Sequence, residues 1–198
     1  KKMIKLPVFF DPNSADNIHV SVGEYFLIFG QFLTAKGWHL IPEIIKRTTG
    51  VKYKVIVKKS ISEEFINSNN LELYVDSGTL EVINFLPTHD LLLNEVARSK
   101  GVLIPSYYPT TGEFTMIESL MLCKPAVVFD AGIHCEIFKD RENGMVAKVG
   151  DIDGYCAKIE DLNTDKELYR KVAAGARKLF DELTSLEVFR AKISSSLK

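Results

Sequence analysis

The stretch YFLIFG at residues 25–30 decides the fold, because five apolar residues run without a break into a glycine. Such a run is typical of a strand in a parallel sheet, where helices bury both faces of the strand. Residues 38–49 follow with apolar side chains at helical spacing, and Gly50 ends the pattern. Glycine is a common helix end, so the sequence predicts a helix directly after the first buried strand.

The same alternation continues along the chain beyond this unit. Further strands are predicted at residues 53–57, 80–85, 102–104, 126–129 and 145–149, and further helices at residues 62–69, 88–99, 114–123 and, with breaks, 151–196. Strands that alternate with helices of about ten residues indicate parallel β-α-β units. We therefore expect an α/β fold with a Rossmann-like, doubly wound open parallel sheet of about six strands.

Composition excludes several classes of protein. The 198 residues are 46% hydrophobic and 26% charged, as in ordinary globular proteins and unlike disordered or fibrous ones. The 25 basic and 26 acidic residues nearly cancel, so we expect no nucleic-acid partner. No apolar run reaches the roughly 20 residues that span a bilayer, and we expect no signal peptide. The three cysteines lack C-x-x-C spacing, which favours a cytoplasmic location over a disulfide framework or a zinc site.

The domain organisation is expected to be simple. Residues 25–198 are predicted to form one domain with a helical tail, because no low-complexity linker interrupts them. Residues 1–24 differ, since a strand-like segment at residues 3–7 is followed by a stretch that contains Asp11, Pro12, Asn13 and Gly23. We expect this stretch to approach the sheet in an extended conformation.

The loops that follow the strands carry the functional signal, since ligands of open α/β sheets bind at the carboxyl ends of strands. These loops are residues 30–37, 105–118, 130–136 and 142–146. In order, they resemble the C-terminal, nucleotide-sugar-binding domain of GT-B fold retaining glycosyltransferases of family 4, the glycosyl transferases group 1. That family has G-R and K-G after its first strand, a P-S loop with two glutamates, K-P-V-V, a glycine turn with a glutamate, and E-N-G. The likeness covers residues 25–150.

The resemblance implies the donor-binding half of a hexosyl-transferring glycosyltransferase, which moves a sugar from a UDP-, GDP- or ADP-sugar to an acceptor with retention. Such an enzyme uses no metal and no other cofactor, because the nucleotide-sugar is its substrate. Residues 1–24 would be a hinge strand and approach from a missing N-terminal domain of the same protein. The expected partners are the donor and that domain, any membrane contact is peripheral, and the isolated chain is expected to be inactive.

The loop after the first strand is expected to bind the diphosphate of the donor. Gly30 lets the backbone approach a phosphate, and Lys36 stands where the family has its diphosphate-binding lysine. Gln31 replaces the family's arginine, so a hydrogen-bond donor is kept while the charge is lost. Without the family context, the same residues would make an ordinary strand-to-helix turn with a solvated lysine.

The loop at residues 105–118 matches the family only in part. Glu118 corresponds to the glutamate that binds the ribose hydroxyls, but the residue eight positions earlier is Thr110 rather than the sugar-binding glutamate. Either Glu113 takes this role through a reshaped loop, or the hydroxyls of Thr110 and Thr111 do, or sugar recognition is degenerate. Glu113 fits equally well as an exposed acid at a helix N-terminus. Glu113 and Glu118 are the candidate catalytic carboxylates.

Backbone groups near this loop form a second candidate phosphate site. The N–H groups around Gly112, Phe114 and Thr115 open a helix, and a helix N-terminus binds phosphate whatever its side chains are. Further along, His134 and Cys135 are neighbours in the sequence. Adjacent residues on a helix point about 100° apart, so these two are not expected to form a catalytic dyad.

Two other functional classes stay open at this point. The substitutions at Gln31 and Thr110 fit a catalytically degenerate family member that keeps a nucleotide pocket or only an interaction surface. The other class is an unrelated doubly wound domain. Against it, the loop after the first strand has neither the G-x-G-x-x-G of dinucleotide-binding proteins nor the clustered aspartates of receivers.

Overall fold

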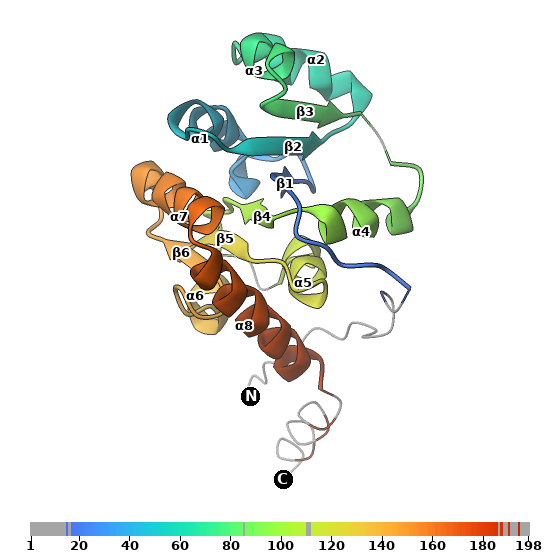
Figure 1. The fold of residues 1–198 in the computed structure, drawn as a ribbon, viewed down its shortest axis with the longest axis vertical. Coiled ribbons are helices and arrows are strands. Elements are labelled where there is room, and N and C mark those ends of the chain that lie inside the picture. Colours follow the sequence, from blue (N-terminus) through green and yellow to red (C-terminus); the bar gives the residue numbers. More distant parts are fainter. Residues whose placement is uncertain are drawn as a thin grey trace, which may run out of the picture.

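The computed structural model describes residues 15, 17–84, 86–109, 112–185, 187, 190 and 194, which Figure 1 shows as a coloured ribbon. Its centre is a sheet of six strands in the order β3-β2-β1-β4-β5-β6. The strands are β1 (Tyr25–Ile28), β2 (Lys52–Ile56), β3 (Leu80–Ile83), β4 (Gly101–Ile104), β5 (Ala126–Phe129) and β6 (Met145–Ala147). All neighbouring strands are parallel, so the predicted Rossmann-like α/β sheet is confirmed.

Helices cover both faces of the sheet. They are α1 (Ile41–Arg47), α2 (Lys59–Asn67), α3 (Glu72–Asp76), α4 (His89–Arg98), α5 (Phe114–Met121), α6 (His134–Ile137), α7 (Ile152–Thr164) and α8 (Lys166–Thr184), with 3₁₀ turns η1 (Thr34–Lys36) and η2 (Trp38–Leu40). Phe26 and Ile28 join the core with α1 and α7, while Leu27 and Phe29 join the core with α4 and α5. Figure 1 accordingly shows α1 and α7 on one side of the sheet and α4 and α5 on the other. The first strand is therefore buried on both faces, as its apolar run predicts.

The helix predicted at residues 38–49 is shorter than expected, because η1 and η2 come first and α1 begins only at Ile41. Gly37 lies between the two turns with a φ of 76°, and a Cβ on it would lie 2.0 Å from the backbone oxygen of Pro105. Only glycine fits this position. Pro42 then lies in the first turn of α1, where its missing N–H has no helical acceptor to lose. The contact at Gly37 holds the loop after β1 against the loop after β4.

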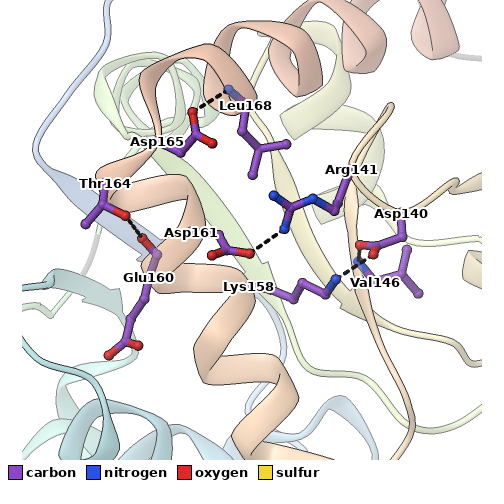
Figure 2. Close-up of polar contacts among 9 residues, drawn as sticks. All are labelled: Asp140, Arg141, Val146, Lys158, Glu160, Asp161, Thr164, Asp165 and Leu168. Atoms are coloured by element: carbon purple, nitrogen blue, oxygen red, sulfur yellow. Dashed lines mark hydrogen bonds and ion pairs between the residues drawn. The ribbon is translucent and has the colours of Figure 1, made fainter.

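Other elements differ from their predicted bounds by a few residues. β3 and β6 end earlier than predicted, and α3 is an element that the sequence pattern did not indicate. The helical tail divides at Asp165, whose carboxylate accepts hydrogen bonds from the first turn of α8, including the N–H of Leu168 (Figure 2). The predicted strand at residues 3–7 and most of the tail after residue 185 lie outside the described residues.

Surface ion pairs tie the two residues that precede the E-N-G segment to α7, as Figure 2 shows. Arg141 pairs with Asp161, and Lys158 pairs with Asp140. The second oxygen of Asp140 accepts a hydrogen bond of 2.9 Å from the backbone N–H of Val146. These contacts fix the chain where it enters the edge strand of the sheet.

The chain approaches β1 along the amino ends of the strands, where residues 18–23 have no regular secondary structure. The backbone N–H of Ser21 donates to the oxygen of Ala97, and the buried ammonium of Lys124 donates to the backbone oxygens of Ser21 and Ser99. Burial lowers the pKa of Lys124 to about 8. Within the described ranges, no helix combines the length and the apolar character needed to cross a membrane.

Candidate functional site

The strand order reverses between β1 and β4, which are neighbours in the sheet although β2 and β3 lie between them in the chain. Loops at such a reversal diverge and leave a crevice at the carboxyl ends of the strands. A cavity of about 300 Å³ lies at this place. It brings together the candidate residues Gly30, Gln31, Lys36, Gly112, Glu113, Phe114 and Thr115. Thr110 and Thr111 lie outside the described residues.

Gly30 joins the two walls of this cavity. Its φ of 116° is one that residues with side chains rarely adopt, and a Cβ there would lie 3.2 Å from Oγ1 of Thr115. Two further cavities also include Gly30: one of about 440 Å³ that contains His89, and one of about 540 Å³ that contains Gln31 and Lys58. Gly30 thus lies where these three cavities meet at the carboxyl edge of the sheet.

An ion pair crosses the first cavity. Lys36, at the end of η1, donates from its ammonium to Oε1 of Glu113, the residue that precedes the first turn of α5. The Lys36 side chain keeps 32% of its surface exposed, whereas that of Glu113 keeps only 3%. Glu113 is therefore a buried counter-ion, and its interpretation as an exposed acid at a helix N-terminus is wrong.

The partners of Glu113 decide its charge. Burial alone raises the pKa of its carboxyl, but contacts with His134, Lys36 and Ser106 outweigh burial and lower the pKa to about 2. Glu113 is thus ionised at neutral pH. The sequence could not indicate this, because the three partners come from three different loops.

His134 is the functional candidate that the sequence pattern missed. It is fully buried at the start of α6, its Nδ1 lies 3.3 Å from the backbone oxygen of Phe129, and its Nε2 lies 3.5 Å from Oε2 of Glu113. Nε2 makes no hydrogen bond of good geometry within the described part of the chain. Its neighbour Cys135 is exposed and donates to the oxygen of Gly132, so the two side chains lie on different sides of α6.

Glu118 lies on the other side of α5 from the Lys36 ion pair. Its side chain is only 8% exposed, and its Oε1 lies 2.7 Å from Nε2 of His89, the first residue of α4. Burial raises the pKa of Glu118, and the contact with His89 offsets this only in part. Glu118 does not line the first cavity, whereas His89 lines the second. The sequence suggested neither the contact with His89 nor this separation.

The first cavity has the features of an anion site. The start of α5 carries the positive end of its helix dipole, and residues Gly112 to Thr115 line the cavity there. The Lys36 side chain, which is 32% exposed, stands on the opposite wall. Apolar side chains such as Trp38 and Ile104 form the rest of the lining, so a charged ligand would be partly shielded from water. Among the described residues, no group of three or more His, Cys, Asp or Glu side chains is arranged to hold a metal ion.

Two comparisons with known sequences both indicate glycosyltransferases. Residues 11–179 match the family described as glycosyl transferases group 1. A putative glycosyltransferase of Bacillus subtilis (strain 168), EpsD, is 35% identical over 75 residues, which make up 36% of this chain and 20% of EpsD.

Two solved structures have the same fold. A TarM variant from S. aureus, in complex with fondaparinux, alpha-GlcNAc-glycerol and UDP, has a TM-score of 0.74 at 21% identity and covers 96% of this chain and 38% of TarM. Anabaena HepE, in complex with UDP and glucose, has a TM-score of 0.74 at 16% identity and covers 97% of this chain and 55% of HepE. The chain thus spans at most 55% of the length of these three proteins.

Proposed function

The chain belongs to the glycosyl transferases group 1 family, and from this premise we propose that it forms the nucleotide-sugar site of a glycosyltransferase. The observation that carries the proposal is the cavity at the strand reversal, which combines Gly30, Lys36 and the start of α5. The reaction would transfer a hexosyl group to an acceptor with retention. UDP is the first nucleotide to test, because TarM and HepE were solved with it.

The proposed chemistry is stabilisation of a departing diphosphate. Negative charge develops on the diphosphate as the glycosidic bond breaks, and fixed donors aimed at that charge lower the barrier. Lys36 and the N–H groups at Gly112, Phe114 and Thr115 are the proposed donors, with the neutral amide of Gln31 beside them. Gly30 contributes by leaving room for the diphosphate at the end of β1.

Glu118 is the proposed ligand of the ribose hydroxyls. Its Oε1 contacts His89 at 2.7 Å, which fixes the carboxylate, while Oε2 has no hydrogen bond to another described residue. Because a buried carboxylate is poorly solvated, ribose hydroxyls would supply the donors that it lacks. The raised pKa of Glu118 agrees with a carboxylate that is short of donors before a ligand binds.

We propose a different role for Glu113. One of its oxygens contacts Lys36 and the other faces His134, so both oxygens already face cationic or donor side chains of the protein before a sugar binds. We therefore assign Glu113 to the support of Lys36. The hydroxyls of Thr110 and Thr111 are the proposed replacements for the sugar-binding glutamate, on the strength of their sequence positions.

The domain organisation is also a proposal. Residues 25–198 would be the donor-binding domain, and residues 1–24 would connect it to an N-terminal domain that binds the acceptor in the cytoplasm. The support is that the chain corresponds to 38% of TarM and 55% of HepE. Reacting groups must be held together for transfer, so the chain by itself is expected to bind a donor without transferring the sugar.

The test is a thermal-shift and calorimetry panel with UDP, GDP, ADP and their glucose conjugates on the 198-residue chain. A ligand at one hundred times its Kd stabilises the folded state by about 2.7 kcal/mol, which a thermal shift detects easily. We expect one base to be preferred. If none of these nucleotides shifts the melting temperature, the proposed donor site is wrong.

A catalytically degenerate family member is the second candidate function. It is favoured by Gln31, which lacks the charge of the family's arginine, and by the ion pair that already occupies Lys36. The two candidates differ in one measurement. Nucleotide binding together with transfer by the full-length protein supports the enzyme, whereas binding without any transfer supports the degenerate member.

A further inference from the structure

We propose that His134 is a positioning residue of the donor site: it holds and neutralises the Glu113 carboxylate, so that the Lys36 ammonium beside it stays available to the diphosphate. The inference rests on the proposed function, because it adds a residue to the same site. It concerns a side chain that does not line the cavity and that no sequence motif indicates.

The position of His134 is fixed on every side. Its side chain has no exposed surface, and its ring packs against Phe138 with centroids 5.9 Å apart. The backbone N–H of His134 donates to the oxygen of Ala131, and Nδ1 of the ring faces the backbone oxygen of Phe129 at 3.3 Å. In this buried arrangement Nε2 faces Glu113, with Oε2 at 3.5 Å.

Both ring nitrogens of His134 face acceptors. The carbonyl oxygen of Phe129 can only accept, and the ionised carboxylate of Glu113 can only accept. A neutral imidazole has one N–H, whereas an imidazolium has two. The geometry therefore assigns a proton to each nitrogen and a positive charge to the ring. A contraction of a few tenths of an ångström from 3.5 Å would complete the hydrogen bond between Nε2 and Oε2.

This charge changes what Lys36 can do. With His134 charged, the three side chains of Lys36, Glu113 and His134 carry one net positive charge at the wall of the cavity. Without it, Glu113 would cancel Lys36, and a buried carboxylate would repel a diphosphate brought next to it. The Glu113 side chain is only 3% exposed, so solvent water cannot compensate its negative charge in place of His134. His134 thus decides whether the wall attracts or rejects an anion.

The experiment compares a ligand that has phosphates with one that lacks them. Binding of UDP and of uridine to the 198-residue chain is measured by calorimetry, with GDP and guanosine or ADP and adenosine instead if the nucleotide panel selects them. For His134→Leu we expect UDP affinity to fall about fivefold and uridine affinity to stay within about twofold, since hydrogen bonds to charged groups are worth about a factor of ten.

Two other substitutions at the same position separate charge from packing. His134→Gln keeps an amide donor that reaches Glu113 but carries no charge, so we expect UDP affinity to stay about fivefold below that of the parent chain; recovery to within about twofold would overturn the neutralising role of His134. His134→Asn keeps a donor near Phe129 but is too short to reach Glu113. It should lose UDP affinity like His134→Leu, and it carries the test if the leucine variant does not fold. Cys135→Ala is the matched control on the same helix, because Cys135 is exposed and contacts Gly132.

A background substitution shows whether His134 acts through Glu113. In Glu113→Gln there is no carboxylate left to neutralise, so adding His134→Leu should change UDP affinity by less than about twofold. An equal loss for UDP and uridine, an undiminished loss in the Glu113→Gln background, or no loss at all would each overturn the inference. If the parent chain binds UDP while the His134 variants are unaffected, only this inference fails. If the parent chain binds no nucleotide, the proposed function fails with it.

Discussion

Two sides of α5 use the same chemistry with opposite results. On one side Glu113 faces Lys36 and His134, and on the other Glu118 faces His89. Both carboxylates are almost completely buried, yet the pKa of Glu113 is lowered to about 2 and that of Glu118 is raised. The difference lies in the number of partners, since Glu113 has three and Glu118 has one. A carboxylate with all its partners inside the protein supports the site, and one that lacks partners is ready for a ligand.

The largest expected effect is on stability and tests this difference directly. Glu113→Gln leaves His134 and Lys36 without their anion, and breaking a buried pair in this way should lower the free energy of unfolding by about 3 kcal/mol. Glu118→Gln removes a charge that burial already disfavours, so its change should stay under about 1 kcal/mol. Urea denaturation at pH 7 measures both. Equal losses would mean that the two carboxylates do not differ in this way.

The next effect is a dependence of stability on pH. The pKa of Glu113 is lower in the folded state than its ordinary value of 4.5, so its contribution is present above pH 4.5 and is lost as the pH falls toward about 2. Between pH 5 and pH 3 this should cost about 2 kcal/mol. Glu118 has a raised pKa and acts with the opposite sign, so its neutralisation favours the folded state as the pH falls. Urea titrations of the parent chain and Glu113→Gln should show that the variant lacks the loss.

Ligand binding should reverse the ranking of the two carboxylates. Glu118→Gln removes a charged acceptor from the proposed ribose contact, so UDP and uridine should both bind tenfold or more weakly, which is about 1.5–2 kcal/mol. Calorimetry measures the change. Unaltered binding of both ligands by Glu118→Gln would remove Glu118 from the proposed site.

Lys36 should show a loss that depends on phosphate. Lys36→Ala is expected to weaken UDP by about tenfold, or about 1.4 kcal/mol, and to leave uridine nearly unchanged, because the ammonium meets only the diphosphate. Lys58→Ala is a useful control, since Lys58 lines the two other cavities at Gly30 but not the first. A uridine loss as large as the UDP loss would contradict a phosphate contact.

The smallest effect belongs to the exposed ion pairs in Figure 2. Arg141 and Asp161 remain 45% and 43% exposed, so Asp161→Ala should lower the free energy of unfolding by less than about 1 kcal/mol at low salt. Added salt should reduce even this. A loss comparable with that of Glu113→Gln would show that burial is not what distinguishes the pairs around the cavity.

The sequence predicts most of the fold because the strands are continuous apolar runs. The apolar runs at residues 26–29 and 126–129 indicate strands that are buried on both faces, and the helices between strands follow from their spacing. The start of α1 was not predictable in the same way. The apolar residues at 38, 40 and 41 fit a helix that begins at Trp38, yet the chain forms 3₁₀ turns there, beside the close contact of Gly37 with Pro105. Such a contact depends on tertiary structure and leaves no local pattern.

The site was predictable only where it follows the strand ends. Gly30 and Lys36 come directly after β1, so the fold class alone indicates that they lie at the carboxyl edge. The contacts of Glu113 with His134 and of Glu118 with His89 join residues 21 and 29 positions apart on different helices. Their formation depends on how α4, α5 and α6 are oriented, which periodicity does not report.

Gly30 limits which residues around the three cavities can be substituted independently of one another. Lys36 belongs to one cavity and His89 to another, so each can be exchanged without touching the other. Gly30 belongs to all three, and a Cβ at its φ of 116° would be strained whichever ligand is bound. Residues that line a single cavity can therefore change without affecting the other cavities. Gly30 lines all three cavities and tolerates no replacement. A library that varies the residues lining only one cavity, and keeps Gly30 constant, would explore the ligand preference of the proposed donor site without disturbing the position that the three cavities share.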